Sequence, residues 1–151
     1  MKNIPFQTID WSGIAKEEHK GESGSAFWQI RQFEGLRIRL VEYSPGYLAD
    51  HWCLKGHIVH CLEGEFISEL SSGEEFTLTP GMTYIVSDEL SSHRSKTEKG
   101  VKLLIIDGDF LKTEDGRRRT EDGRQRMEDR GSRIPNPVSR SIHEKLQRYL
   151  F

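Results

Sequence analysis

Several features that would identify a function are missing from this sequence. Its 151 residues include two cysteines, too few for a disulfide framework, and no apolar run approaches the roughly 18 residues of a membrane span. No hydrophobic signal region follows Met1, and no nucleophile elbow, phosphate loop or dinucleotide fingerprint occurs. We therefore expect a soluble cytoplasmic protein whose Cys53 and Cys61 are free thiols or metal ligands.

Net charge is also small, and it is unevenly distributed. Residues 1–112 hold 12 basic and 17 acidic residues, a net −5, whereas residues 113–151 hold 10 and 7, a net +3. Since the larger part is mildly acidic and has no basic stripe, we expect neither nucleic acid nor a membrane as its partner. The length fits one domain, which we assign to residues 1–112.

The basic part begins with a seven-residue repeat over residues 113–133. Its seam positions hold no apolar residue except Met127, so a coiled coil would bury nothing, and its dense mixed charge predicts disorder. An arginine-rich arm for RNA or acidic lipid is the alternative, which the six acids among its seven arginines weaken. In the last segment, residues 134–151, the spacing of Ile142, Leu146 and Tyr149 suits a short helix.

Residues 25–112 predict short strands separated by frequent turns, with no room for an ordinary helix. This pattern is typical of an antiparallel sandwich or barrel. The alternation over residues 36–40 places Leu36, Ile38 and Leu40 on one strand face and Arg37 and Arg39 on the other. We expect the aliphatic face to be the dry one.

Residues that bind metals gather in one stretch. Four of the six histidines and both cysteines fall within residues 51–93. On a strand, residues two apart point the same way, so His51 and Cys53 could share an ion. After a bend at Lys55 and Gly56, His57 starts the next apolar run, in which Cys61 shares its face and His60 takes the other. We expect Cys61 to pack in the core, with a redox-active thiol as the alternative, and His60 to face away from the site, toward solvent or an interface.

The same stretch resembles the first motif of the cupin superfamily. Gly46, His51-x-Cys53, three residues, His57, six residues and Gly64 reproduce the motif's spacing, one residue short in the first gap, with a Cys and a His in place of its second His and its Glu. Gly81, the run 82–86, a turn and His93 are similar to the second motif.

The sequence also resembles a small cupin group named for an Asp-His-Cys-Trp motif. The four residues stand here in the order Asp50, His51, Trp52 and Cys53. The resemblance implies a small antiparallel jelly-roll β-barrel that forms homodimers and holds one divalent metal ion, with His51, Cys53, His57 and His93 at the four ligand positions. It covers residues 1–112.

The chemistry of this ligand set favours particular metals. Three imidazoles and one thiolate suit zinc first and iron(II) next, rather than magnesium or calcium. Asp50 and Tyr84 could support the ligands by hydrogen bonds, or be an ordinary turn acid and strand aromatic.

Three functions fit this interpretation of the sequence as a cupin-like β-barrel. The first is a metalloenzyme of oxygenase or isomerase type that acts on a small molecule, with catalytic residues that the sequence does not identify. The second is a non-catalytic metal-binding or sensing module, and the third is a β-barrel that holds no ion.

Overall fold

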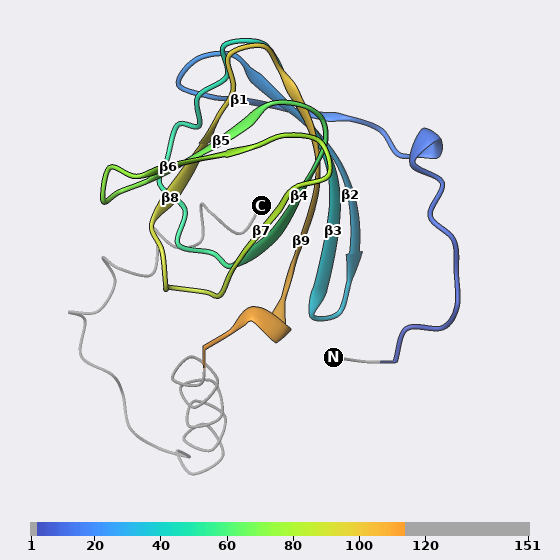
Figure 1. Ribbon diagram of the computed structural model, residues 1–151. Coiled ribbons are helices and arrows are strands. Elements are labelled where there is room, and N and C mark those ends of the chain that lie inside the picture. Colours follow the sequence, from blue (N-terminus) through green and yellow to red (C-terminus); the bar gives the residue numbers. More distant parts are fainter. Residues whose placement is uncertain (1–2, 114–151) are drawn as a thin grey trace, which may run out of the picture. The chain divides into compact units, whose positions relative to one another are not determined.

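The computed structural model describes residues 3–113. The predicted charged repeat, apart from Thr113, and the predicted segment 134–151 therefore lie outside the described residues. Within the described range the regular secondary structure is almost entirely β-strand (Figure 1), and no helix there is long and apolar enough to cross a membrane. The elements are η1 (Trp11–Gly13), β1 (Glu17–Lys20), β2 (Ser25–Phe33), β3 (Leu36–Tyr43), β4 (His57–Gly64), β5 (Phe66–Leu70), β6 (Glu75–Leu78), β7 (Thr83–Val86), β8 (His93–Lys96), β9 (Val101–Gly108) and η2 (Asp109–Leu111).

The strands form two antiparallel sheets. One has six strands in the order β1-β2-β3-β9-β4-β7, and the other has three in the order β6-β5-β8. Apolar side chains of both sheets form one core, including Phe66 and Leu78 of the smaller sheet and Val41, Val59 and Leu103 of the larger. This is the all-β jelly-roll architecture that the sequence predicts.

The two sheets do not close into a single barrel in the described part of the chain. Instead, the connection between β3 and β4 runs beside the smaller sheet and forms isolated bridges with β8, one between Leu48 and Lys96 and one between Cys53 and His93. Leu48 also pairs with Ser23, next to β2. The connection therefore links the edges of the two sheets where ladder pairing stops.

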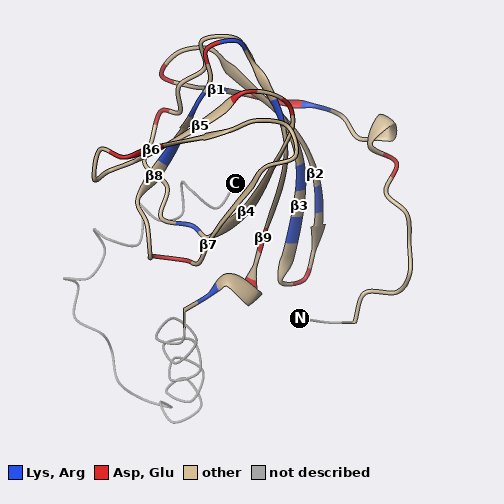
Figure 2. Cartoon of the chain, in the orientation of Figure 1, with Lys and Arg blue, Asp and Glu red and all other residues tan. Residues whose placement is uncertain are grey.

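Strand β3 has the predicted alternation but the opposite orientation. Arg39 is 5% exposed and shares its strand face with the buried Val41 and Tyr43, while Ile38 and Leu40 lie on the other face and are only partly buried. The expectation that the aliphatic face is the dry one was therefore wrong, since the Arg39 side chain lies inside the protein. Figure 2 shows the basic bands along β3. A buried carboxylate, Asp107, compensates the arginines, as described below.

The outward face of the six-stranded sheet carries a row of isoleucines. Register places Ile38 opposite Ile106, Ile106 opposite Ile58 and Ile58 opposite Ile85, so the row crosses four adjacent strands. At its end, on the edge strand β7, Ile85 is 68% exposed. This sheet is therefore apolar on both faces along part of its width.

Candidate metal site

Backbone pairing places Cys53 beside His93. The Cys53 N–H donates to the His93 carbonyl at 2.7 Å, and the His93 N–H donates to the Cys53 carbonyl at 3.0 Å. His93 is the first residue of β8, in the smaller sheet. Two residues that are forty positions apart in the sequence are thus held side by side by main-chain bonds, which do not depend on their side chains.

Contacts of the bend before β4 set the position of His57. The Asp88 carboxylate accepts a hydrogen bond from the Gly56 N–H at 2.7 Å and lies 3.2 Å from the Lys55 Nζ. A Cβ on Gly56 would lie 2.6 Å from the Asp88 nitrogen, so the bend can approach the β7–β8 connection this closely only with glycine. Directly after the bend, His57 begins β4 in the larger sheet.

The backbone pairing of Cys53 with His93 and the contact between Gly56 and Asp88 bring three possible ligand atoms together. One ligand atom each from Cys53, His57 and His93 lies within 4.8 Å of the other two, and Cys53 Sγ is 3.4 Å from His57 Nε2. The imidazole rings of His57 and His93 meet edge to face, with centroids 5.6 Å apart. His57 is 8% exposed and His93 is 3% exposed. These three side chains lie close enough to bind one metal ion.

The donor atoms are suited to a cation. Burial lowers the pKa of His57 to about 4 and lowers the pKa of His93, so both imidazoles are neutral near pH 7. Burial also raises the pKa of the Cys53 thiol, which a bound ion would oppose. His93 Nε2 is buried and makes no hydrogen bond to any described residue. A metal ion would satisfy that nitrogen.

Asp107 is the residue that sequence reasoning missed. Its Oδ2 lies 3.5 Å from His57 Nδ1, a buried atom that makes no hydrogen bond within the described residues. The Asp107 carboxylate accepts hydrogen bonds from Arg37 Nε at 3.0 Å and Arg39 Nη2 at 2.7 Å. Burial alone would raise the pKa of Asp107, but His57 and the two arginines together hold it well below its usual value. A carboxylate behind an imidazole fixes the ring's orientation and directs its other nitrogen toward a metal. The sequence did hold one sign of its burial, because Asp107 lies two residues beyond Ile105 and so falls on the same strand face as Leu103 and Ile105, which is the buried face of β9.

His51, the fourth predicted ligand, is not a member of this close group. Its Nδ1 lies 2.6 Å from Asp50 Oδ1, and its side chain is 38% exposed. Its role as a ligand stays a prediction. Asp50 contacts His51 and not the buried trio, and the supporting role predicted for it also stays a prediction.

The other residues singled out from the sequence occupy distinct places. Tyr84 packs its ring 6.0 Å from that of His93, and burial raises its pKa. Cys61 is fully buried in the core, and His60 faces away, with Nδ1 2.8 Å from Thr83 Oγ1. Trp52 is 40% exposed and lies 4.6 Å beneath the Arg94 guanidinium.

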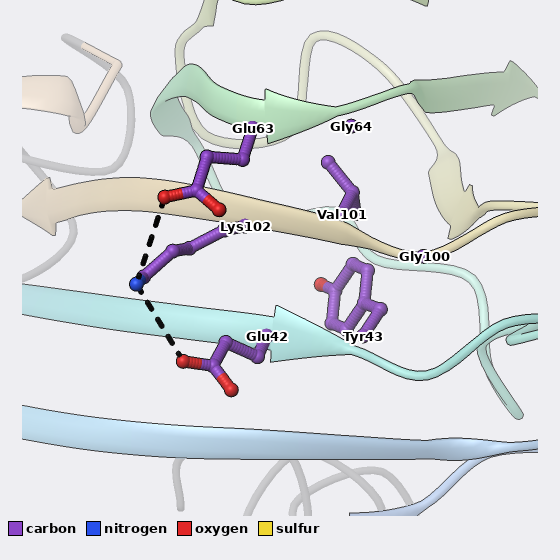
Figure 3. A pocket seen from close by; sticks show the side chains of 7 residues that line it. All are labelled: Glu42, Tyr43, Glu63, Gly64, Gly100, Val101 and Lys102. Carbon is purple, nitrogen blue, oxygen red and sulfur yellow. Dashed lines mark ion pairs between the residues drawn. The ribbon is translucent and has the colours of Figure 1, made fainter.

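A pocket in the surface has a lining that includes none of Cys53, His57 and His93. It is lined by residues at the ends of β3 and β4 and the start of β9, where Lys102 Nζ lies 3.8 Å from Glu42 and 3.9 Å from Glu63 (Figure 3). Gly64 ends β4 in this pocket, seven residues beyond His57. The pocket is therefore separate from the Cys and His group.

Comparison with known proteins defines the fold. No protein-family profile matches the sequence, and no curated protein does. Among solved structures, the chain is similar to the ectoine synthase of P. lautus, with 17% identity and a TM-score of 0.56 over 90% of this chain and 95% of that one. It is also similar to a predicted oxalate decarboxylase from Thermotoga maritima, with 13% identity and a TM-score of 0.57 over 66% and 96%, and to the EutQ protein of Clostridium difficile, with 10% and 0.51 over 66% and 74%.

These similarities, together with the two sheets and their order, show that the chain has the cupin fold that the sequence motifs predicted. At such low identities they define the fold alone. What the chain does has to be argued from Cys53, His57, His93 and their surroundings.

Proposed function

We propose that this chain is a small metalloenzyme with a cupin fold, of oxygenase or isomerase type, acting on a small molecule at one divalent metal ion held by Cys53, His57 and His93. The convergence of their ligand atoms within 4.8 Å is the observation that carries the proposal. A buried polar atom without a partner costs about 1–3 kcal/mol, a cost that ion binding would remove at His93 Nε2.

The donor set supports zinc first and iron(II) next, because a thiolate and two imidazoles suit both ions and disfavour magnesium and calcium. When bound, such an ion supplies Lewis-acid chemistry. The chain's own contribution begins at Asp107, which lies against His57 Nδ1 and favours the tautomer whose Nε2 lone pair points toward Cys53 Sγ. Three protein ligands are typical of catalytic zinc sites, in which another position takes water or substrate.

A second candidate function is a non-catalytic metal-binding or sensing module. The contact between Asp50 and His51 favours it, since a carboxylate beside Nδ1 orients the imidazole and strengthens it as a metal ligand. With His51 as a fourth ligand, a tetrahedral site would be closed and suited to structure or sensing.

Elemental analysis of the full chain, purified without an affinity tag, tests the metal itself. We expect one equivalent of zinc or iron and, after cobalt(II) substitution, a sulfur-to-cobalt charge-transfer band. Cys53→Ser should abolish the band and weaken binding, whereas Cys61→Ser, which alters a buried thiol outside the group, should leave both unchanged. Protein with no stoichiometric metal, or a band that survives Cys53→Ser, would contradict the proposal.

The two functions are separated by adding azide to the cobalt form. A site with a free position takes azide and its visible spectrum changes, as the enzyme proposal requires. A closed site is insensitive to azide and loses metal affinity in His51→Gln. His60→Gln is the matched control, because His60 faces away from the site.

A further inference from the structure

Positive charge is left over inside the protein beside the proposed metal site. Two guanidinium groups, Arg37 and Arg39, share the single carboxylate of Asp107. The side chains of Arg39 and Asp107 are 6% and 4% exposed, and that of Arg37 is 17% exposed. A buried charge without a counter-ion is strongly unfavourable, and a bound divalent cation would increase the excess.

Arg39 also has a donor that the described residues do not use. Its Nη2 binds Asp107, but its Nε is buried and makes no hydrogen bond to any residue of the described range. The guanidinium lies 4.9 Å over the Trp28 ring, whose Nε1 is likewise buried without a described partner. Both atoms only donate, so an acceptor is what this part of the interior lacks.

Arg39 is linked to the proposed metal site through Asp107. Asp107 contacts Arg39 at 2.7 Å and lies 3.5 Å from His57, so the guanidinium and the imidazole are two contacts apart. An anion on Arg39 would therefore lie in the same part of the interior as His57.

We propose that Arg39 and Arg37 form an anion subsite, and that the molecule on which the metal site acts is a small organic acid whose carboxylate binds Arg39 Nε. This inference rests on the proposed function and names its substrate class. A carboxylate supplies the acceptor that Arg39 Nε lacks and offsets part of the excess positive charge, and it is a smaller group than a phosphate.

Trifluoroacetate is a suitable probe, because it is a small carboxylate that is ionised at all relevant pH values and is observed by fluorine NMR. Trifluoroethanol, which has the same CF3 group and no charge, is the matched neutral compound. We expect the full chain to bind trifluoroacetate and not trifluoroethanol, both with zinc and without it. Equal binding of the two compounds would overturn the proposal.

Arg39→Met, which keeps an unbranched stem and removes the charge, should weaken trifluoroacetate binding about ten-fold or more, the usual effect of losing a charged hydrogen bond. Arg31→Met alters an exposed arginine of the neighbouring strand β2 and should have no effect. Unchanged binding by folded Arg39→Met would overturn the subsite. If Arg39→Met does not fold, Arg37→Met serves instead and should also weaken binding, because it removes the excess charge.

Metal content is measured on the same samples, so the two proposals fail separately. Protein that binds metal but not trifluoroacetate contradicts the anion subsite alone. Protein that binds trifluoroacetate through Arg39 but takes up no metal contradicts the proposed function and leaves the subsite standing.

Discussion

Asp107 connects the site's ligands to its charges, since it contacts His57 on one side and both arginines on the other. Asp107→Asn keeps the shape and removes the charge. We expect metal affinity to fall about 10–100-fold, the usual effect of losing a carboxylate behind a ligand histidine. Competition with a chromophoric chelator measures this. Asp109→Asn, at an exposed acid nearby in sequence, is the control, and equal affinities would contradict the role assigned to Asp107.

Burial of His57 makes the metal-free protein sensitive to acid. Its folded-state pKa of about 4 lies below the usual value of 6.5, so the unfolded chain binds more protons and stability falls as pH drops from 6.5 toward 4. The expected loss between pH 7 and pH 5 is on the order of 2 kcal/mol. The lowered pKa of His93 acts in the same direction.

Urea unfolding of chelator-treated protein at several pH values measures the effect. His57→Gln should show a shallower dependence of unfolding free energy on pH over this range, because the variant lacks the buried imidazole. An unchanged slope in His57→Gln would show that other groups cause the acid sensitivity.

Single residues differed in how far their sequence context determined their role. The grouping of Cys53 and His57 could be predicted from cupin spacing and strand parity, and that of His93 from its looser match to the second cupin motif. Asp107 and Arg39 could not, because each is explained only by the other, and they are far apart in the sequence. His51 shows the limit of spacing, since it has the predicted separation from Cys53 but lies outside the close group.

At the scale of elements, strand β3 shows why alternation does not determine which face is buried. Leu36, Ile38 and Leu40 make a regular aliphatic face, and in an isolated strand that face would be the one to bury. The neighbouring strand decides otherwise, because Asp107 of β9 pairs with Arg37 in register and holds two arginines inside. In β4 no such conflict exists, and the predicted faces of His57 and His60 are the observed ones.

The bend before β4 depends on Gly56. In Gly56→Ala the new Cβ would lie 2.6 Å from the Asp88 nitrogen and 2.7 Å from the Ser87 carbonyl carbon, so backbone has to move. We expect a loss of about 1–3 kcal/mol in unfolding free energy together with weaker metal binding. Gly13→Ala is the control, since nothing lies within 4 Å of its added Cβ. Wild-type stability and metal affinity in Gly56→Ala would show that the bend is not constrained.

At the scale of the whole molecule, the row of isoleucines on the larger sheet bears on assembly. The homodimer implied by the cupin resemblance stays a prediction, and this row is the apolar face that we expect a second copy to cover. Ile85→Lys places a charge at its most exposed end. We expect light scattering to show a dimer for the wild-type chain and a monomer for Ile85→Lys. Thr77→Lys, on the exposed edge strand β6, is the control, and a wild-type monomer would refute the prediction.

The predicted boundary near residue 112, with the repeat 113–133 and the segment 134–151 beyond it, also stays a prediction. The cupin fold itself could be predicted from glycine spacing and strand parity. The separation of the two sheets could not, because the connection that carries Cys53 meets β8 only through isolated bridges between residues distant in the sequence.

His57 belongs to the six-stranded sheet, His93 to the three-stranded sheet, and Cys53 to the connection that runs between them. An ion bound by all three would be a cross-link between the two halves of the fold. Loss of the ion should therefore act most on the opening of one sheet from the other, and least on unravelling within either. Amide hydrogen exchange would reveal this as faster exchange along β8 and the Cys53 connection after chelation, with the centres of β3 and β9 protected as before.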